Sequence, residues 1–326
     1  MLTSDHISEL CVSLDLELFP LCADANRDYR FVKELLSAEP IPIFEHSYFY
    51  IIGSLLHHSS MHAIRGAFGL AVIVTSPQIT YLLSPAIRDV ASFSTVVGSL
   101  LDLLPGNELN LRYLTERWVD SFIPNLKGYR IAVEPRSTAE AVYEVARLTK
   151  LEGPQFRNLR ARRRKLLDSG SMTFLPLNAS GVLRDAISIL QAWQSSQGNK
   201  YQKNRYEREV FTLEQFTSLS TAGSCDSSFE VGYCEGRPLS IACFYRSDSL
   251  SNWGGICFVK AINHPEVGGV PGASDATYCH VFRKASSLGI THLNDGDIGT
   301  EEGTRKHKMQ FQPVQFLRSF DIKVRR

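Results

Sequence analysis

The chain has 326 residues, of which 44% are hydrophobic and 21% are charged, and its formal net charge is +1. This composition excludes a mainly disordered, collagen-like or coiled-coil protein and is typical of a globular protein with one large domain or two. The small net charge hides an asymmetry. Residues 1–150 carry 12 Lys and Arg against 17 Asp and Glu, whereas residues 151–326 carry 23 against 17. We therefore expect an anionic partner to bind the second half.

Apolar spacing and turn residues predict the elements of the first half. Helix 90–104 ends before Pro105-Gly106, and a polar stretch near 134–155 is the expected domain boundary. The expected elements are, in chain order, helix 7–19, helix 31–36, a strand or buried segment at 46–56, a hairpin of strands 68–75 and 79–83, helix 90–104, strand 109–113, helix 115–122 and strand 129–133.

The second half gives a clearer pattern. It is expected to contain helices 156–167, 183–194 and 275–288 and strands 229–234, 239–245, 253–258 and 291–294. Three consecutive strands, a helix and a returning strand predict a mixed sheet of the α/β (α+β) class. Strands and helices do not alternate regularly, which argues against a dinucleotide-binding fold or a barrel.

The cysteines and the N-terminus indicate the compartment. Seven cysteines, an odd number without a C-x-x-C pair, are typical of reduced thiols rather than of a disulfide framework or a zinc site. The opening MLTSDHISEL lacks the basic and apolar regions of a signal peptide, and no run approaches the ~20 apolar residues of a membrane span. We expect a cytoplasmic protein with no transmembrane segment and no metal site.

Familiar catalytic motifs are missing: no G-x-x-x-x-G-K-[ST], G-x-G-x-x-G, H-E-x-x-H or G-x-S-x-G occurs. Two segments stand out instead. Six of the nine residues from 157 to 165 are basic, and like charges so closely spaced favour an anionic partner over a merely solvated helix face. Near the end, an acidic, glycine-rich loop (NDGDIG, 294–299) is followed by a basic segment (GTRKHKMQFQP, 303–313). The loop offers carboxylates for an ammonium group, and the segment offers cations for an anion.

Together these segments resemble the C-terminal domain family of the phosphatidylglycerol lysyltransferases. One family signature, Leu-x-Gly-x-x-Phe before an Arg/Lys-rich helix, is matched by Leu151, Gly153 and Phe156. The other is an Asn, an acidic-Gly loop and then Gly-Leu-Arg-x-x-Lys-x-x-[Tyr/Phe]-x-Pro. It is matched by Asn294, Asp297, Gly299, Gly303, Arg305, Lys308, Phe311 and Pro313, with Thr304 in place of Leu. The resemblance covers about 151–320.

The resemblance implies the fold of the GCN5-related N-acyltransferases (GNAT), in two tandem copies of which the first is degenerate. We expect a degenerate GNAT-like domain over 1–145 and a GNAT-like aminoacyl transferase domain over 146–326. The implied reaction moves an aminoacyl group from aminoacyl-tRNA to a small-molecule amine or hydroxyl or to a lipid head group. The ester is already activated, so positioning and oxyanion stabilisation suffice, and no cofactor is expected.

The resemblance also suggests residue roles. Asn294 and Asp297 would hold the α-ammonium group, Arg305 and Lys308 would contact phosphates or an anionic acceptor, and Asp275 would orient the site or cap its helix. Trp253 is a candidate for stacking on the substrate, although core packing is the commoner role of such a residue. The arginines expected to follow the tRNA backbone are Arg157, Arg160, Arg163 and Arg164. Residues 160–165 and 318–326 would mediate any peripheral contact with anionic lipid.

Two other functions stay open. An acyl-CoA-dependent N-acyltransferase has the same fold, but its pyrophosphate loop needs a basic residue that KAINHPEVGGVPGA (260–273) does not place suitably. A non-catalytic RNA-binding protein is the further alternative. A nest of backbone N–H groups large enough for a pyrophosphate would favour the first alternative, and an open basic channel leading to Asp297 would favour the aminoacyl-tRNA-dependent enzyme.

Overall fold

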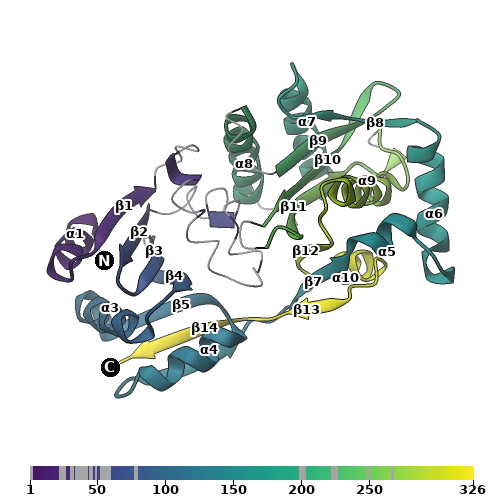
Figure 1. Ribbon diagram of the computed structural model, residues 1–326. Helices are drawn as coiled ribbons and strands as arrows, with labels where there is room; N and C mark the ends of the chain where they lie inside the picture. The colour runs from purple at the N-terminus through teal and green to yellow at the C-terminus, as the bar shows by residue number, and fades with distance from the viewer. Residues whose placement is uncertain are drawn as a thin grey trace. The chain divides into compact units, whose positions relative to one another are not determined.

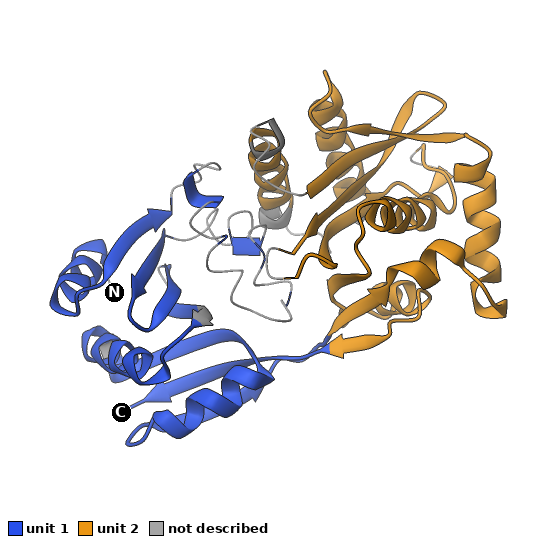
Figure 2. Ribbon diagram, in the orientation of Figure 1, with its two compact units in different colours: residues 1–139, 317–326 blue, residues 140–316 orange. Residues whose placement is uncertain are grey.

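The computed structural model describes residues 3–21, 27–29, 33, 43, 47, 50–51, 60–76, 80–197, 203–221, 227–247, 250–265 and 268–326. The chain forms two compact units, coloured separately in Figure 2. Residues 1–139 and 317–326 make the first unit, and residues 140–316 make the second. The expected division into 1–145 and 146–326 differs at both ends, because the second unit begins at Glu140 and the last ten residues belong to the first unit.

A seven-stranded sheet forms the first unit, in the order β1-β2-β3-β4-β5-β14-β6. All neighbouring strands are antiparallel except β4 and β5, which run parallel. Helices α1, α3 and α4 contribute to one hydrophobic core with this sheet. The elements are α1 Ser4–Ser13, β1 Glu17–Leu21, β2 Ser60–Gly66, β3 Gly69–Thr75, β4 Thr80–Ile87, α3 Val90–Leu103, β5 Glu108–Thr115, α4 Glu116–Phe122, β6 Arg130–Pro135 and β14 Ser319–Arg325.

The second unit has a seven-stranded sheet in the order β13-β7-β12-β11-β10-β9-β8, in which β11 and β12 are the parallel pair (Figure 1). Its helices lie on both faces: Thr277 of α9 bonds Ser240 on one face, and Trp193 of α7 lies over Lys260 on the other. The elements are β7 Glu140–Glu144, α5 Val145–Lys150, α6 Arg157–Arg163, β8 Met172–Pro176, α7 Val182–Gln197, α8 Lys203–Thr221, β9 Ser227–Cys234, β10 Arg237–Arg246, β11 Trp253–Ala261, α9 Ala273–Ser287, β12 His292–Asp297, α10 Glu302–Met309 and β13 Gln315–Leu317.

The two sheets repeat one strand order. The described strands, counted along the chain, form two sets of seven, strands 1 to 7 and strands 8 to 14. Each sheet places a strand of the other set between its own fifth and sixth strands. In the first unit that strand is β14, between β5 and β6, and in the second it is β7, between β12 and β13. The chain is therefore a tandem repeat whose two copies have exchanged their last strands.

The structure confirms the mixed α/β class, the 68–75 and 79–83 hairpin (β3 and β4) and the helices at 90–104, 183–194 and 275–288. The expected helix 7–19 is wrong in its second half, since α1 ends at Ser13, Asp15 has a φ of 52° and β1 begins at Glu17. Most of 31–36 and 46–56 lies outside the described residues. Among the described helices, none has both the length and the apolar composition needed to cross a membrane.

Candidate functional site

The candidate site lies at the carboxyl ends of the two parallel strands of the second unit. Three residue pairs join β11 to β12, from Trp253–His292 to Gly255–Asn294, although the strands continue to Ala261 and Asp297. Beyond Asn294, β12 bulges against β7, where Asp295 and Gly296 together oppose one residue. Gly296 has a φ of 64°, a left-handed conformation that glycine adopts without strain. The end of the pairing and the bulge together turn the acidic segment away from the regular ladder.

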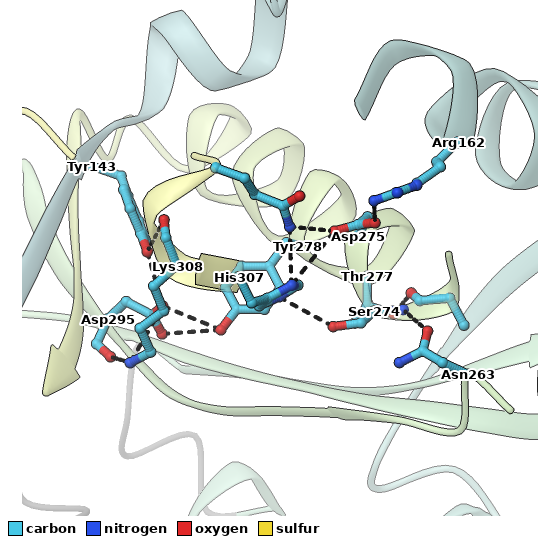
Figure 3. A network of polar contacts seen from close by, with 12 residues as sticks. Tyr143, Arg162, Asn263, Ser274, Asp275, Thr277, Tyr278, Asp295, His307 and Lys308 are labelled. Carbon is cyan, nitrogen blue, oxygen red and sulfur yellow. Dashed lines mark hydrogen bonds and ion pairs between the residues drawn. The ribbon is translucent and has the colours of Figure 1, made fainter. Parts of the chain in front are cut away.

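Asp295 is the buried centre of the site, with a side-chain exposure of 4% (Figure 3). The hydroxyls of Tyr143 and Tyr278 donate to Asp295 Oδ2 at 3.1 and 3.2 Å, and Lys308 Nζ lies 3.5 Å from the same oxygen. Lys308 Nζ also donates to the main-chain oxygens of Asp295 and Asp297. Lys308 therefore holds the acidic segment to α10.

Burial dominates the electrostatics of this centre. Burial raises the pKa of Asp295, and Lys308 together with the two tyrosine hydroxyls opposes the rise. The pKa values of Tyr143 and Tyr278 are also raised, first by burial and then by the neighbouring Asp295. Both phenols thus remain protonated donors at neutral pH, which fixes the position of the carboxylate.

The two residues expected to hold an ammonium group, Asn294 and Asp297, differ in exposure. Asn294 is buried, donates through Nδ2 to Glu140 Oε2 at 2.6 Å and accepts from Gly296 N–H at 2.8 Å. Asp297 is exposed, and its Oδ1 accepts from Gly299 N–H at 2.6 Å. Asn294 shapes the bulge, whereas Asp297 presents a carboxylate at the surface. The buried Glu140 adds a third carboxylate beside Asp295 and Asp297.

Asp275 belongs to a second polar cluster, at the start of α9. Its carboxylate accepts from Arg162 Nη1 and from Gln310 Nε2, the latter at 2.6 Å, and His307 Nδ1 lies 3.7 Å away. Gly272, not Asp275, is the N-cap residue of α9. The interpretation of Asp275 as a helix cap is therefore wrong: the carboxylate joins the basic helix to α9 and α10.

The loop before α9 shows how its backbone donors are used. The N–H groups of Gly268, Gly269, Val270 and Ala273 donate to carbonyls of the same loop, at 2.9 to 3.0 Å. Ser274 N–H donates to Asn263 Oδ1 at 3.0 Å. The side chain of Arg162 covers Gly272, where an added Cβ would lie 3.2 Å from Arg162 Cγ. These donors and this helix end are thus occupied by the protein itself.

The basic helix divides into inward and outward residues. Arg160 donates to the Leu151 and Gly153 carbonyls, and Arg163 donates to the Thr149 carbonyl and lies 3.5 Å from Asp168. These two arginines stabilise the turn before α6 and the π-helical turn after it. Within residues 157–165, all of which the structure describes, the exposed basic residues without such bonds are Arg157, Arg164 and Lys165.

The remaining candidates lie apart from one another. Trp253 is half-buried and stacks on His292, with ring centroids 5.0 Å apart. His292 precedes Asp297 by five residues, which is about 16 Å along a strand, so Trp253 is not brought to the acidic segment. Arg305 is exposed on α10.

Sequence reasoning gave no site role to six residues of these two clusters. They are Tyr143, Tyr278 and Asp295 in the first and Arg162, His307 and Gln310 in the second. Arg162, Asp295, His307 and Gln310 lie inside the two segments singled out in the sequence. Only the bulge decides that Asp295 is buried while Asp297 is exposed. Nothing in the sequence marked Tyr143 and Tyr278, because a tyrosine that bonds a site residue cannot be told from one that only packs in the core when a single sequence is available.

Three solved structures of similar fold place these observations in context, each at low identity. A conserved protein of unknown function from Bacteroides thetaiotaomicron has a TM-score of 0.78 at 12% identity, covering 95% of this chain and 100% of that one. The C-terminal domain of a putative lysylphosphatidylglycerol synthetase from Agrobacterium fabrum has a TM-score of 0.62 at 12% identity, covering 93% and 92%. A tandem GNAT protein from the clavulanic acid biosynthesis pathway has a TM-score of 0.50 at 10% identity, covering 94% and 98%.

These likenesses confirm the tandem GNAT-like fold and the resemblance to the lysyltransferase C-terminal domain, at the level of the fold. No model of a protein family matches the chain, and no curated protein sequence matches it.

Proposed function

We propose that the chain is an aminoacyl-tRNA-dependent transferase that moves an aminoacyl group to a small-molecule amine or hydroxyl or to a lipid head group. The observation that carries this proposal is the acidic segment Asn294–Asp297, fixed at the end of the parallel pair by the Asp295–Lys308 contact. It offers an exposed carboxylate, that of Asp297, for an ammonium group. The shared fold with a putative lysylphosphatidylglycerol synthetase supports the same function.

In this function Asp297 receives the α-ammonium of the aminoacyl group, because its carboxylate is exposed and already oriented by Gly299 N–H. Asn294, Asp295 and Lys308 are positioning residues, since their polar groups bond within the loop. Arg157, Arg164 and Lys165 follow the phosphates of the acceptor stem, and Arg305 contacts phosphate or an anionic acceptor. The acceptor's nucleophilic atom attacks the ester carbon, and the tRNA 3′ oxygen leaves with a proton.

The loop before α9 favours aminoacyl-tRNA over acyl-CoA as the donor. A CoA pyrophosphate needs free backbone N–H groups near a helix N-terminus. Here Gly268, Gly269, Val270, Ala273 and Ser274 use theirs within the protein. Arg162 and Asp275 further occupy the start of α9.

The test supplies both donors to the same protein. The chain is incubated with a pool of radiolabelled aminoacyl-tRNAs and a cell extract of small molecules and lipids, and the loss of each ester-bound label is scored. A parallel reaction with acetyl-CoA scores the release of free thiol. Loss of one class of label without thiol release is expected. Thiol release with every aminoacyl ester intact would overturn the proposal.

A further inference from the structure

The first unit repeats the strand arrangement of the candidate site with different side chains. Its parallel strands, β4 and β5, pair over three residues ending at Leu83–Arg112, and both strands continue. Beyond Leu111, β5 bulges against β14, where Arg112 and Tyr113 together oppose Asp321. Counted from the bulge, Arg112 corresponds to Asp295 and Tyr113 to Gly296, although the parallel pairing of the first unit reaches one residue further along β5.

Tyr113 keeps the bulge at a conformational cost. Its φ is 60°, close to the 64° of Gly296, and a non-glycine residue in this region costs about 1–2 kcal/mol. Strain of this kind persists where the surroundings enforce it, and it is concentrated at binding and catalytic sites. Tyr113 N–H donates to Asp321 Oδ1 at 3.2 Å, and its hydroxyl lies 2.5 Å from that of Tyr50.

The charge at this bulge is opposite to that of the candidate site. The Arg136 guanidinium lies 4.5 Å from the ring centroid of Tyr113 and 3.4 Å from Asp321, and the Arg112 guanidinium lies 4.6 Å from the ring centroid of Tyr81. Arg112 and Arg136 thus place two guanidinium groups against the tyrosine rings at this bulge. In the part of the chain that the structure describes, Arg112 has no acidic partner and is half-buried. We call this group the Arg112 cluster; it consists of Tyr50, Tyr81, Arg112, Tyr113, Arg136 and Asp321.

We propose that the Arg112 cluster is a second binding site, which takes the phosphate group of a small ligand. The planar guanidinium of Arg112 matches two phosphate oxygens, and its half-buried position strengthens the charge-assisted hydrogen bonds. Arg136 adds a second positive charge, and tyrosine hydroxyls are further donors to an anion. The site lies wholly within the first unit and does not depend on the proposed transferase function.

Binding of inorganic pyrophosphate to the full chain tests the proposal, by titration calorimetry at constant ionic strength. Arg112→Gln is expected to weaken binding by roughly tenfold or more, because it removes a charge-assisted hydrogen bond. Arg112→Lys keeps the positive charge but loses the two parallel N–H donors of the guanidinium, so its affinity should lie between those of the wild type and Arg112→Gln. Lys127→Gln, an exposed residue of the same unit, should bind like the wild type.

Sedimentation with phosphatidylglycerol vesicles distinguishes a lipid head group from a free phosphate compound. Arg112-dependent binding in either arm supports the site and identifies the source of the phosphate. If the wild type binds neither probe, or if Arg112→Gln and Arg112→Lys bind as well as Lys127→Gln in both arms, the proposal is wrong. Melting curves without probe establish that each variant is folded.

Discussion

The Lys308 side chain does three things at once: it faces the Asp295 carboxylate and holds two main-chain oxygens of the acidic segment. A buried carboxylate depends strongly on its principal cationic partner, and for Asp295 that partner is Lys308. Removing one member of such a pair typically costs about 3–5 kcal/mol, since the other charge stays buried. Lys308 is therefore the residue whose loss should disturb the segment most.

Replacement of Lys308 by Met should lower the free energy of unfolding by about 3 kcal/mol at pH 8 and by less at pH 5. Burial already raises the pKa of Asp295, and loss of Lys308 raises it further. A carboxyl with a raised folded-state pKa stabilises the fold while protonated, and that contribution is lost as pH rises through the folded pKa. Urea unfolding at the two pH values measures the difference. A loss that is equal at both would contradict this account of Asp295.

At the scale of elements, β11 needs its glycines where it meets β10. A Cβ added at Gly254 would lie 2.3 Å from the main-chain oxygen of Tyr245, which no side-chain rotation can relieve. Gly303, in α10, has open space around its Cα. The two glycines therefore form a matched pair, one required by packing and one not.

We expect Gly254→Ala to lower the free energy of unfolding by about 1–3 kcal/mol, because the strands must move apart. Gly303→Ala should raise it by about 0.5–1 kcal/mol, because alanine reduces the entropy lost on forming a helix. Thermal unfolding of both variants measures the difference. Equal changes of the same sign in the free energy of unfolding would show that the close approach of β10 at Gly254 does not affect stability.

The basic helix leads to a prediction about tRNA binding. Arg164 is exposed, whereas Arg160 and Arg163 bond within the protein. Arg164→Ala should weaken tRNA binding and reduce the slope of log affinity against log salt by about 0.9, the contribution of one phosphate contact on a duplex. Arg237→Ala, an exposed change at the start of β10, is the control. If Arg164→Ala leaves the slope of log affinity against log salt unchanged, Arg164 does not contact a tRNA phosphate.

The extent to which sequence predicts this molecule varies with the element. Period and turn residues were sufficient for α3, α7, α9 and the β9–β11 meander. The pattern predicted no strand at β7 or β14, whose partners lie in the other half of the repeat. Strand exchange depends on pairing between residues far apart in the sequence, which a local hydrophobic pattern does not predict. In the site, Asp297 and Asn294 were found by the motif, but the burial of Asp295 depends on a bulge that only the tertiary structure defines.

At the scale of the whole molecule, the exchanged strands make each unit depend on the other half of the chain. β14 lies between β5 and β6, and Ile322 and Val324 are fully buried in the first unit's core. Without β14, β6 loses the strand that it pairs with, and the core loses the buried side chains of Ile322 and Val324. The first unit therefore needs the last residues of the chain in order to fold.

Deletion of residues 317–326 should unfold the first unit. Cys11, buried in that core, would then react with a thiol reagent, whereas Cys279 of the second unit would stay protected. Peptide mapping after brief alkylation measures both, and a chain lacking only Arg326 is the control. Protection of Cys11 in the longer deletion would show that the first unit does not need the exchanged strand.

The most direct test of the proposed function compares aminoacyl-ester loss for the wild type and for Asp297→Asn, with the radiolabelled aminoacyl-tRNA that the wild type consumes. The account predicts that Asp297→Asn slows transfer by roughly 10- to 150-fold, the value of a charge-assisted hydrogen bond of about 1.5–3 kcal/mol, while its melting temperature stays that of the wild type. Transfer by Asp297→Asn at the wild-type rate would contradict it. So would a wild-type protein that consumes acetyl-CoA and no aminoacyl-tRNA.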